Sequence, residues 1–189
     1  MMFISILCNA AIVLCTFFAI CHHLRTVSMR VLFRFFTVLS NVLCAFASLL
    51  VLLCSFFGNT PTPVLILKYV GTAAVSVTML TVFLFLGPTT KSWKELLTGP
   101  DLFLHLICPL LAIISYVFFE QIELPFAVTL LGTLPVPFYG FLYLKKVIYT
   151  PAPNNWDDFY GFNRTGKWPI SFLAMILGAF LVSVILWAI

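Results

Sequence analysis

The stretch from Leu102 to Phe119 reads LFLHLICPLLAIISYVFF, and it decides which class of fold the chain adopts. It is nearly as long as the roughly 20 apolar residues that a helix needs to cross a bilayer. Five further apolar stretches can span a membrane in the same way: residues 2–20, 31–57, 64–86, 124–144 and 169–188. None of them alternates between polar and apolar residues as membrane β-strands do. The sequence therefore predicts an all-α, polytopic membrane protein whose residues 1–189 form one domain, a bundle of six transmembrane helices.

The composition also indicates that lipid surrounds this chain. Of its 189 residues, 62% are hydrophobic and 8% are charged, and the mean hydropathy is +1.14. Soluble domains carry about 25% charged residues, so a soluble fold could not bury this much apolar surface. The net charge of +4 is small and dispersed, which argues against a nucleic-acid partner. The six cysteines show neither CxxC spacing nor clustering with histidine, so we expect no metal site.

The basic residues predict which helix ends face the cytoplasm. They gather in the first, third and fifth connections between the apolar stretches, whereas Glu120 and Glu123 fall in the fourth. By the positive-inside rule, those three connections are cytoplasmic and both termini lie on the other side of the membrane, the plasma membrane if the chain is bacterial. Lys68, just inside the third stretch, is expected to extend its ammonium group toward the surface. The clustered residues are Arg25, Arg30, Arg34, Lys91, Lys94, Lys145, Lys146, Arg164 and Lys167.

His105 interrupts the apolar stretch 102–119 about one turn from its start. An ionisable side chain inside a membrane helix is costly and commonly marks a functional site. Imidazole has an unperturbed pKa of about 6.5 and therefore suits a general base near neutral pH. The alternative is a packing histidine that hydrogen-bonds a neighbouring helix. Asp101, four residues earlier on the same face, can orient the ring or cap the start of the helix.

A polar stripe in the second stretch contains Thr37, Ser40 and Asn41. Their spacing of i, i+3 and i+4 places them on one helix face. Thr37 offers a hydroxyl nucleophile, and Ser40 or Asn41 can donate to a developing oxyanion. The alternative is that the stripe only bonds to its own backbone and joins helices. If the helix begins near residue 31, Thr37 lies about 9 Å inside it, at a depth similar to that of His105. The sequence thus permits the two side chains to meet.

The fifth stretch and the fifth connection carry two further signals. Gly132, Pro135, Pro137 and Gly140 predict a kink or local unwinding in the fifth helix, which is often a sign of a cavity. The connection 149–167 is the longest and most polar segment of the chain. It can cover the site as a lid, bind lipid head groups, or serve as an ordinary interfacial loop whose aromatic side chains lie at the membrane boundary.

Two short motifs resemble a known family. Phe36-Thr37-Val-Leu-Ser40-Asn41 and Asp101-Leu-Phe-Leu-His105-Leu-Ile-Cys-Pro109, with the helix count, resemble the androgen-induced and androgen-dependent membrane hydrolases. The chain is most similar to the small bacterial members of that family, which have six predicted spans. The resemblance covers most of the chain. It implies an intramembrane threonine hydrolase that cleaves fatty acid esters of hydroxy fatty acids or related lipids, with Thr37 as the nucleophile and His105 as the base.

From these signals we expect a lipid-ester hydrolase that needs no cofactor and no metal ion. Its partners would be membrane lipids and a lipid or fatty-acyl ester substrate. Thr37 and His105 are the expected catalytic residues, and Asp101, Ser40 and Asn41 are expected to support them. An acyltransferase of the same chemistry fits the sequence equally well, because a hydroxyl acceptor can replace water. The alternative class is a small transporter or lipid-binding protein that uses His105 for proton coupling or head-group contact.

Overall fold

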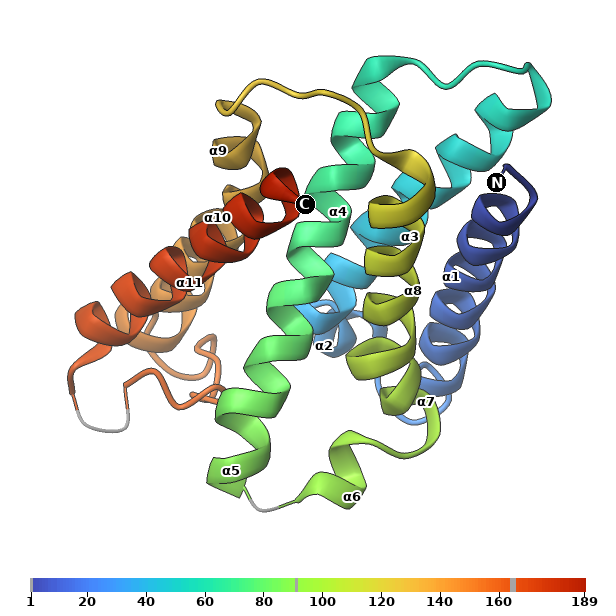
Figure 1. The fold of residues 1–189 in the computed structure, drawn as a ribbon. Coiled ribbons are helices and arrows are strands. Elements are labelled where there is room, and N and C mark those ends of the chain that lie inside the picture. Colours follow the sequence, from blue (N-terminus) through green and yellow to red (C-terminus); the bar gives the residue numbers. More distant parts are fainter. Residues whose placement is uncertain (1, 91, 164–165) are drawn as a thin grey trace.

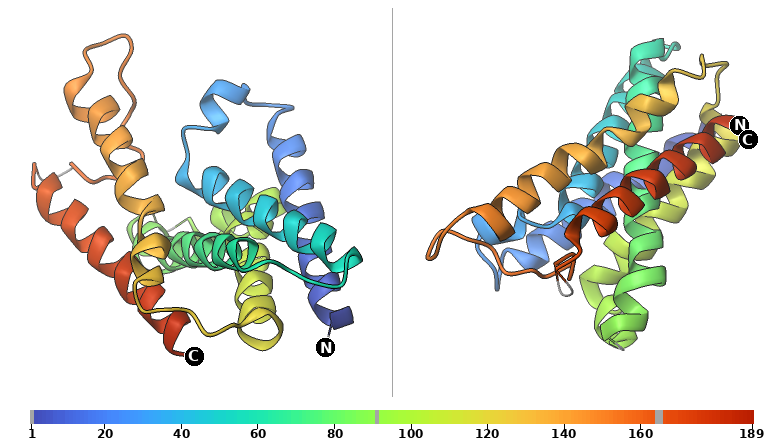
Figure 2. Two further views of the ribbon diagram at one scale, coloured as in Figure 1. Left: turned by 90° about the horizontal axis from the view of Figure 1, so that it is seen from above. Right: turned by 90° about the vertical axis from the view of Figure 1, so that its left-hand side faces the viewer.

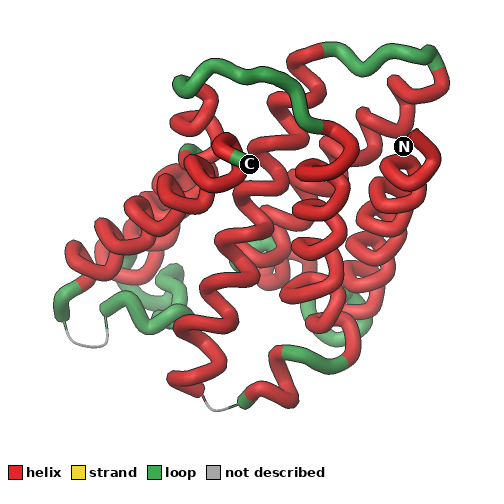
Figure 3. The backbone as a smooth tube through the Cα atoms, viewed as in Figure 1, coloured by secondary structure: helices red, strands yellow, loops and turns green. Residues whose placement is uncertain are grey.

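The chain folds entirely as helices and loops in this computed structural model, which describes residues 2–90, 92–163 and 166–189 (Figures 1 and 3). No strand occurs within these three ranges. Five helices are long and apolar enough to cross a membrane: Phe3–His23, Phe36–Phe56, Thr62–Thr89, Gly99–Glu120 and Trp168–Ala188. The prediction of an all-α chain is therefore confirmed within the described residues, which hold five candidate membrane-spanning helices where six spans were predicted.

Each of these five spans consists of one or more consecutive helical elements. Three are single helices: α1 (Met2–His23), α3 (Phe36–Phe56) and α11 (Trp168–Ala188). The third span joins α4 (Thr62–Thr81), η1 (Val82–Leu86) and α5 (Gly87–Thr90). The fourth joins α7 (Gly99–Leu102), η2 (Phe103–Ile107), α8 (Cys108–Ser115) and η3 (Tyr116–Glu120). The short helices α2 (Met29–Leu32) and α6 (Trp93–Leu96) lie in the connections.

The predicted fifth span is helical but divided. It consists of α9 (Val128–Thr133), α10 (Pro135–Leu144) and the π-helical turn η4 (Lys145–Tyr149). Pro135 has no N–H to offer the carbonyl of Leu131, so the regular hydrogen-bond pattern is interrupted there. Leu134, between the two helices, keeps helical backbone angles of φ −51° and ψ −38°. The predicted local irregularity is thus confirmed, and its cause is the proline.

Two groups of helices share α4 as a common member. On one side α1, α3, α4 and α8 pack together, and on the other α9 and α11 pack against α4 while α10 packs on α11 (Figure 2). In both groups, a glycine allows two helices to pack closely against each other. A Cβ at Gly71 would lie 2.9 Å from Cα of Cys44, so glycine lets α4 reach the backbone of α3. A Cβ at Gly132 would overlap Ser183 Oγ and lie 2.7 Å from Cε1 of Tyr69, which joins α9, α11 and α4.

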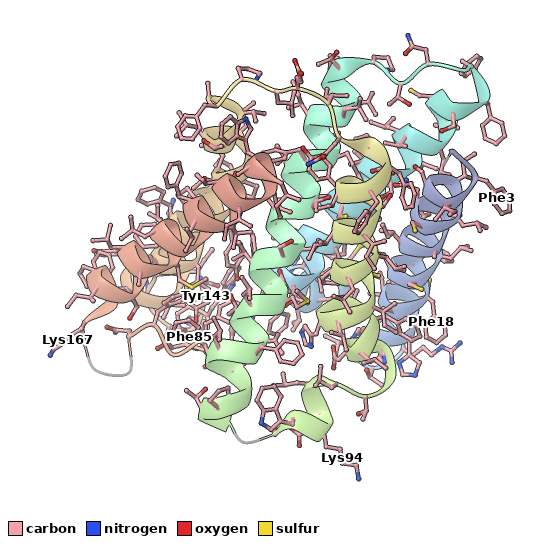
Figure 4. All side chains as sticks on the ribbon, in the orientation of Figure 1. Phe3, Phe18, Phe85, Lys94, Tyr143 and Lys167 are labelled. Carbon is pink, nitrogen blue, oxygen red and sulfur yellow. The ribbon has the colours of Figure 1, made fainter. Side chains whose placement is uncertain are left out.

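The connections alternate between the two ends of the molecule, as the sequence predicts. The N- and C-termini lie at the end that also holds the second and fourth connections (Figure 1). The first, third and fifth connections form the opposite end, which we call the basic end. Lys94 and Lys167 extend from it (Figure 4). Lys91 and Arg164, which contributed to the charge pattern, lie outside the described residues.

Candidate functional site

Thr37 lies at the start of a helix and not deep within one. The predicted helix 31–57 begins too early, because residues 33–35 form a turn and α3 starts at Phe36. Phe35 is extended, with φ −89° and ψ 130°, and no side chain caps the helix. Thr37 is therefore the second residue of α3, close to the basic end. Its backbone N–H belongs to the first turn, where helix amides lack intrahelical acceptors.

Thr37 faces a pocket between the two helix groups. The pocket has a cavity volume of about 40 Å³, and α3, α4, η1, α10 and α11 supply most of its walls. Its lining is largely apolar, and Tyr160 and Phe162 from the fifth connection close one side. Thr37 is 8% exposed. Among the hydrogen bonds of the described residues, none joins the Thr37 hydroxyl to a backbone carbonyl of its own helix. In contrast, Thr78 and Thr81, on the same pocket wall, make such bonds.

Tyr160 is the polar neighbour of Thr37 in this pocket. Its hydroxyl accepts a hydrogen bond from the N–H of Phe36 at 2.9 Å. The side chains of Thr37 and Tyr139 line the same pocket as Tyr160. Tyr139 in turn donates its hydroxyl proton to the carbonyl oxygen of Arg34 at 2.6 Å. A chain of two phenols and one threonine therefore surrounds the start of α3.

Ser40 and Asn41 are close to Thr37, but they do not offer free donors to the pocket. The hydroxyl of Ser40 lies 2.8 Å from Thr78 Oγ1 and 3.1 Å from the carbonyl oxygen of Thr37. The amide nitrogen of Asn41 donates to the carbonyl oxygens of Thr37, at 2.8 Å, and Leu104, at 3.0 Å. The donors of both residues are engaged in these contacts, and donation by either residue to an oxyanion stays a prediction. Asn41 joins α3 to the backbone immediately before His105.

His105 is buried at the same end, in the middle of a π-helical turn. Pro109, four residues further on, has no N–H to donate to the carbonyl of His105, and the wider turn η2 forms at this point. His105 Nδ1 lies 2.8 Å from the carbonyl oxygen of Leu96. A carbonyl can only accept, so Nδ1 carries the proton and Nε2 of the neutral ring has a free lone pair. In this tautomer Nε2 is the ring nitrogen that could accept a proton, as a general base does.

The structure brings Thr37 and His105 to neighbouring helices but does not join them. No hydrogen bond connects the two side chains among the described residues, and His105 does not line the pocket of Thr37. Asn41 is the link between them, because it binds the backbone of Thr37 and of Leu104. The expected pairing of nucleophile and base therefore stays a prediction.

Asp101 does not orient His105. Its carboxylate lies 3.1 Å from His23 Nε2, at the end of α1, and its side chain is 37% exposed. Leu96, in the loop before α7, supplies the hydrogen-bond acceptor that the sequence analysis assigned to Asp101. Asp101 is in the first turn of α7, where a carboxylate also interacts favourably with the helix dipole. It therefore ties α7 to α1.

A second polar cluster, at the end opposite to the basic end, was missed by the sequence analysis. Lys68 is 0% exposed and Glu120 is 6% exposed. The Lys68 ammonium donates to Asn9 Oδ1 at 2.7 Å and to Ser48 Oγ at 2.8 Å, and it lies 3.6 Å from Glu120 Oε2. Lys68 thus does not extend to the surface, and Glu120 belongs to the fourth span and not to the connection. The sequence did contain a signal for this cluster. Lys68 lies inside one apolar stretch and Glu120 at the end of another, and ionisable residues in such places commonly pair with each other.

Comparisons of the chain with known protein families, with curated proteins and with solved structures find no match. Across the described ranges, no three side chains of His, Cys, Asp or Glu gather closely enough to hold a metal ion. Thr37 and Tyr160 line the pocket, and His105 lies on a neighbouring helix at the same end of the molecule.

Proposed function

We propose that this protein is an intramembrane lipid-ester hydrolase in which Thr37 is the nucleophile and His105 the general base. The observation that carries the proposal is the position of Thr37. Among the described residues its hydroxyl makes no hydrogen bond to a backbone carbonyl of its own helix, and it lines a largely apolar pocket. The family resemblance given above supports the same two residues. A hydroxyl is a weak nucleophile at its ordinary pKa, so it requires a base such as the available Nε2 of His105.

We further propose that the chain spans the membrane six times. The segment 128–149 comprises α9, Leu134, α10 and η4 in direct succession. A helix of this length extends about 33 Å at ~1.5 Å per residue, which is enough for the hydrocarbon core. With six spans both termini share one side of the membrane, and the positive-inside rule then makes the basic end cytoplasmic.

The proposed reaction has two steps. Thr37 Oγ attacks the ester carbonyl carbon while its proton passes to Nε2 of His105. The tetrahedral intermediate then collapses, the alcohol leaves with the proton that His105 returns, and an acyl-threonine ester remains. In the second step His105 takes a proton from water, which attacks that ester and restores the hydroxyl of Thr37. Catalytic hydrogen bonds often tighten only when substrate is bound, so the transfer requires His105 and Thr37 to approach each other in the complex.

A second cavity supports a lipid substrate. A groove with a volume of about 650 Å³ runs between α3, α4, α9 and α10, and it shares Phe36 and Tyr139 with the pocket. Its walls include the exposed side chains of Leu134 and Phe138, which lipid would surround. An acyl chain can therefore approach Thr37 from the bilayer. Fatty acid esters of hydroxy fatty acids are the specific candidates that the resemblance suggests.

The test is covalent capture with a fluorophosphonate probe on the full chain in detergent. We expect modification at Thr37 in the wild type and in Thr37→Ser, and none in Thr37→Ala or His105→Ala, by peptide mass. Thr133→Ala is the matched control. Thr133 is as buried as Thr37, but its hydroxyl bonds to the carbonyl of Thr129 at 2.7 Å, away from the pocket. Labelling at another residue, or labelling that survives Thr37→Ala, would contradict the proposal.

A transporter or lipid-binding function is the second candidate, and the buried pair of Lys68 and Glu120 favours it. Intramembrane charges often mark the path of an ion or a proton. In that case Thr37→Ala leaves the function largely intact, whereas Lys68→Met removes it. An acyltransferase is distinguished from a hydrolase by adding a long-chain alcohol and searching for the transacylated product by mass spectrometry.

A further inference from the structure

Tyr160 occupies a position that the proposed reaction has not yet used. It comes from the fifth connection, and its ring lines the same pocket as Thr37. Its oxygen accepts the N–H of Phe36 at 2.9 Å, at the first residue of α3. Its own proton is not used by that bond, and the side chains of Thr37 and Tyr139 line the pocket with it. The Tyr160 hydroxyl can therefore donate a hydrogen bond in the pocket that Thr37, the expected nucleophile, also lines.

The segment that carries Tyr160 is held firmly in place. The carboxylate of Asp158 accepts hydrogen bonds from the hydroxyl of Tyr143, at 2.8 Å, and from the backbone N–H of Phe162, at 3.0 Å. The hydroxyl of Tyr143 also accepts the N–H of Tyr160 at 3.1 Å. Tyr143 itself is buried in α10, on the side that faces the loop (Figure 4). Gly161, at φ 71°, then turns the backbone away, which a residue with a side chain does less readily.

Tyr160 also keeps its proton. Burial raises the pKa of the Tyr160 phenol above its usual value, and this outweighs the hydrogen bonds from the start of α3. At neutral pH the group is thus a hydrogen-bond donor that remains charge-neutral in an apolar pocket. Phenols of this kind are among the groups that stabilise a developing oxyanion.

We propose that the hydroxyl of Tyr160 donates a hydrogen bond to the carbonyl oxygen of the bound acyl ester and stabilises the oxyanion that forms there. This inference rests on the proposed function of Thr37. It replaces Ser40 and Asn41, whose donors are already engaged with Thr78 and with backbone carbonyls. The substrate oxygen is then the acceptor of the Tyr160 proton.

The step balances without transfer of the Tyr160 proton. The bond from Thr37 Oγ to the carbonyl carbon forms, and the electron pair of the C=O bond moves to the carbonyl oxygen. The proton of Thr37 moves to His105, as in the reaction above. Tyr160 only shares its proton with the new oxyanion, so it returns unchanged when the C–O bond to the alcohol breaks. Because the hydrogen bond strengthens as charge develops, its loss should slow the chemical step more than it weakens binding.

The test measures the rate of fluorophosphonate labelling at Thr37 in the full chain, separated into kinact and KI. In this probe the phosphoryl oxygen takes the place of the carbonyl oxygen, and fluoride is the leaving group. We expect Tyr160→Phe to lower kinact by about 100-fold, with little change in KI and in thermal stability. Tyr149→Phe is the matched control, because Tyr149 is 67% exposed and lies outside the pocket; its kinact should equal that of the wild type.

The outcomes separate this inference from the function on which it rests. If wild-type Thr37 is labelled and Tyr160→Phe is labelled within about threefold of the same rate, the role of Tyr160 is refuted while the proposed function stands. If wild-type Thr37 is not labelled, both fall. If Tyr160→Phe does not fold, 3-fluorotyrosine at position 160 gives the second measurement. It keeps the ring and hydroxyl but is a stronger acid and donor, so it should raise kinact by about twofold or more, and an unchanged kinact overturns the inference.

Discussion

The buried pair of Lys68 and Glu120 allows a quantitative prediction that does not depend on the enzymatic proposal. Glu120 Oε1 accepts hydrogen bonds from Ser5 Oγ at 2.7 Å and from the amide of Asn9. Asn9 Oδ1 in turn accepts a hydrogen bond from the Lys68 ammonium at 2.7 Å. Each charge thus has a partner of opposite sign and neutral hydrogen-bonding groups around it. Removing one charge leaves the other buried without its counter-ion.

The size of the effect follows from the separation of the charges. At an effective dielectric constant of about 20, two unit charges attract by about 4.6 kcal/mol when they are 3.6 Å apart, as Lys68 Nζ and Glu120 Oε2 are. Breaking a buried pair typically costs about 3–5 kcal/mol. We therefore expect Lys68→Met and Glu120→Gln each to lower the free energy of unfolding by about that amount. The double variant leaves no lone charge in the protein interior. Its loss in free energy of unfolding should therefore be smaller than the sum of the two single losses by at least about 2 kcal/mol.

The assay is reversible unfolding by sodium dodecyl sulfate in mixed micelles, followed by far-UV circular dichroism, on the wild type, both single variants and the double variant. Lys94→Met, at an exposed lysine of the basic end, is the control and should change stability by less than about 0.5 kcal/mol. The reasoning is wrong if the two charges prove not to be coupled. That would be the case if the double variant loses as much free energy of unfolding as the two single variants together, within about 0.5 kcal/mol.

Two further predictions concern packing and pH. Gly132→Ala should destabilise the fold by about 1–3 kcal/mol, because its Cβ would overlap neighbouring side chains, whereas Gly178→Ala, with open space around it, should be neutral or stabilising in the same unfolding assay. Equal effects of the two changes would contradict this account. Burial raises the pKa of Tyr160 above its usual value of about 10, so its contribution to stability is complete below that pH and is lost as the pH rises through the raised pKa. Tyr160→Phe should therefore flatten the alkaline decline in stability, and an identical decline in both proteins would count against it.

Much of the fold follows from local sequence, because a run of apolar residues in lipid must satisfy its backbone internally. The helices therefore lie close to where hydropathy places them. The irregularity of the fifth stretch also follows from sequence, since Pro135 cannot donate a backbone hydrogen bond. The start of α3 does not follow from the sequence, because residues 33–35 are as compatible with a helix as with the turn that they form. That difference moves Thr37 from the interior of a helix to its first turn.

The partners of polar side chains could not be predicted, since each depends on packing between segments distant in sequence. Asp101 meets His23 and not His105, four residues away, because α7 lies against the end of α1. His105 finds a backbone carbonyl instead, that of Leu96. From the sequence, the connection that carries Tyr160 was assigned no specific contact. Tyr160 lies near Thr37 because the fifth connection folds against the start of α3.

The arrangement around Lys68 also bears on how the protein is assembled. Helices enter the membrane in the order of synthesis, so Lys68 arrives after Asn9 and Ser48 but before Glu120. During that interval the neutral side chains of Asn9 and Ser48 are the hydrogen-bond acceptors for the Lys68 ammonium, because Glu120 has not yet been synthesised. Insertion of the fourth span then completes the pair and locks α8 onto the three helices already present. A chain arrested before Glu120 would therefore hold the Lys68 ammonium group without its counter-charge.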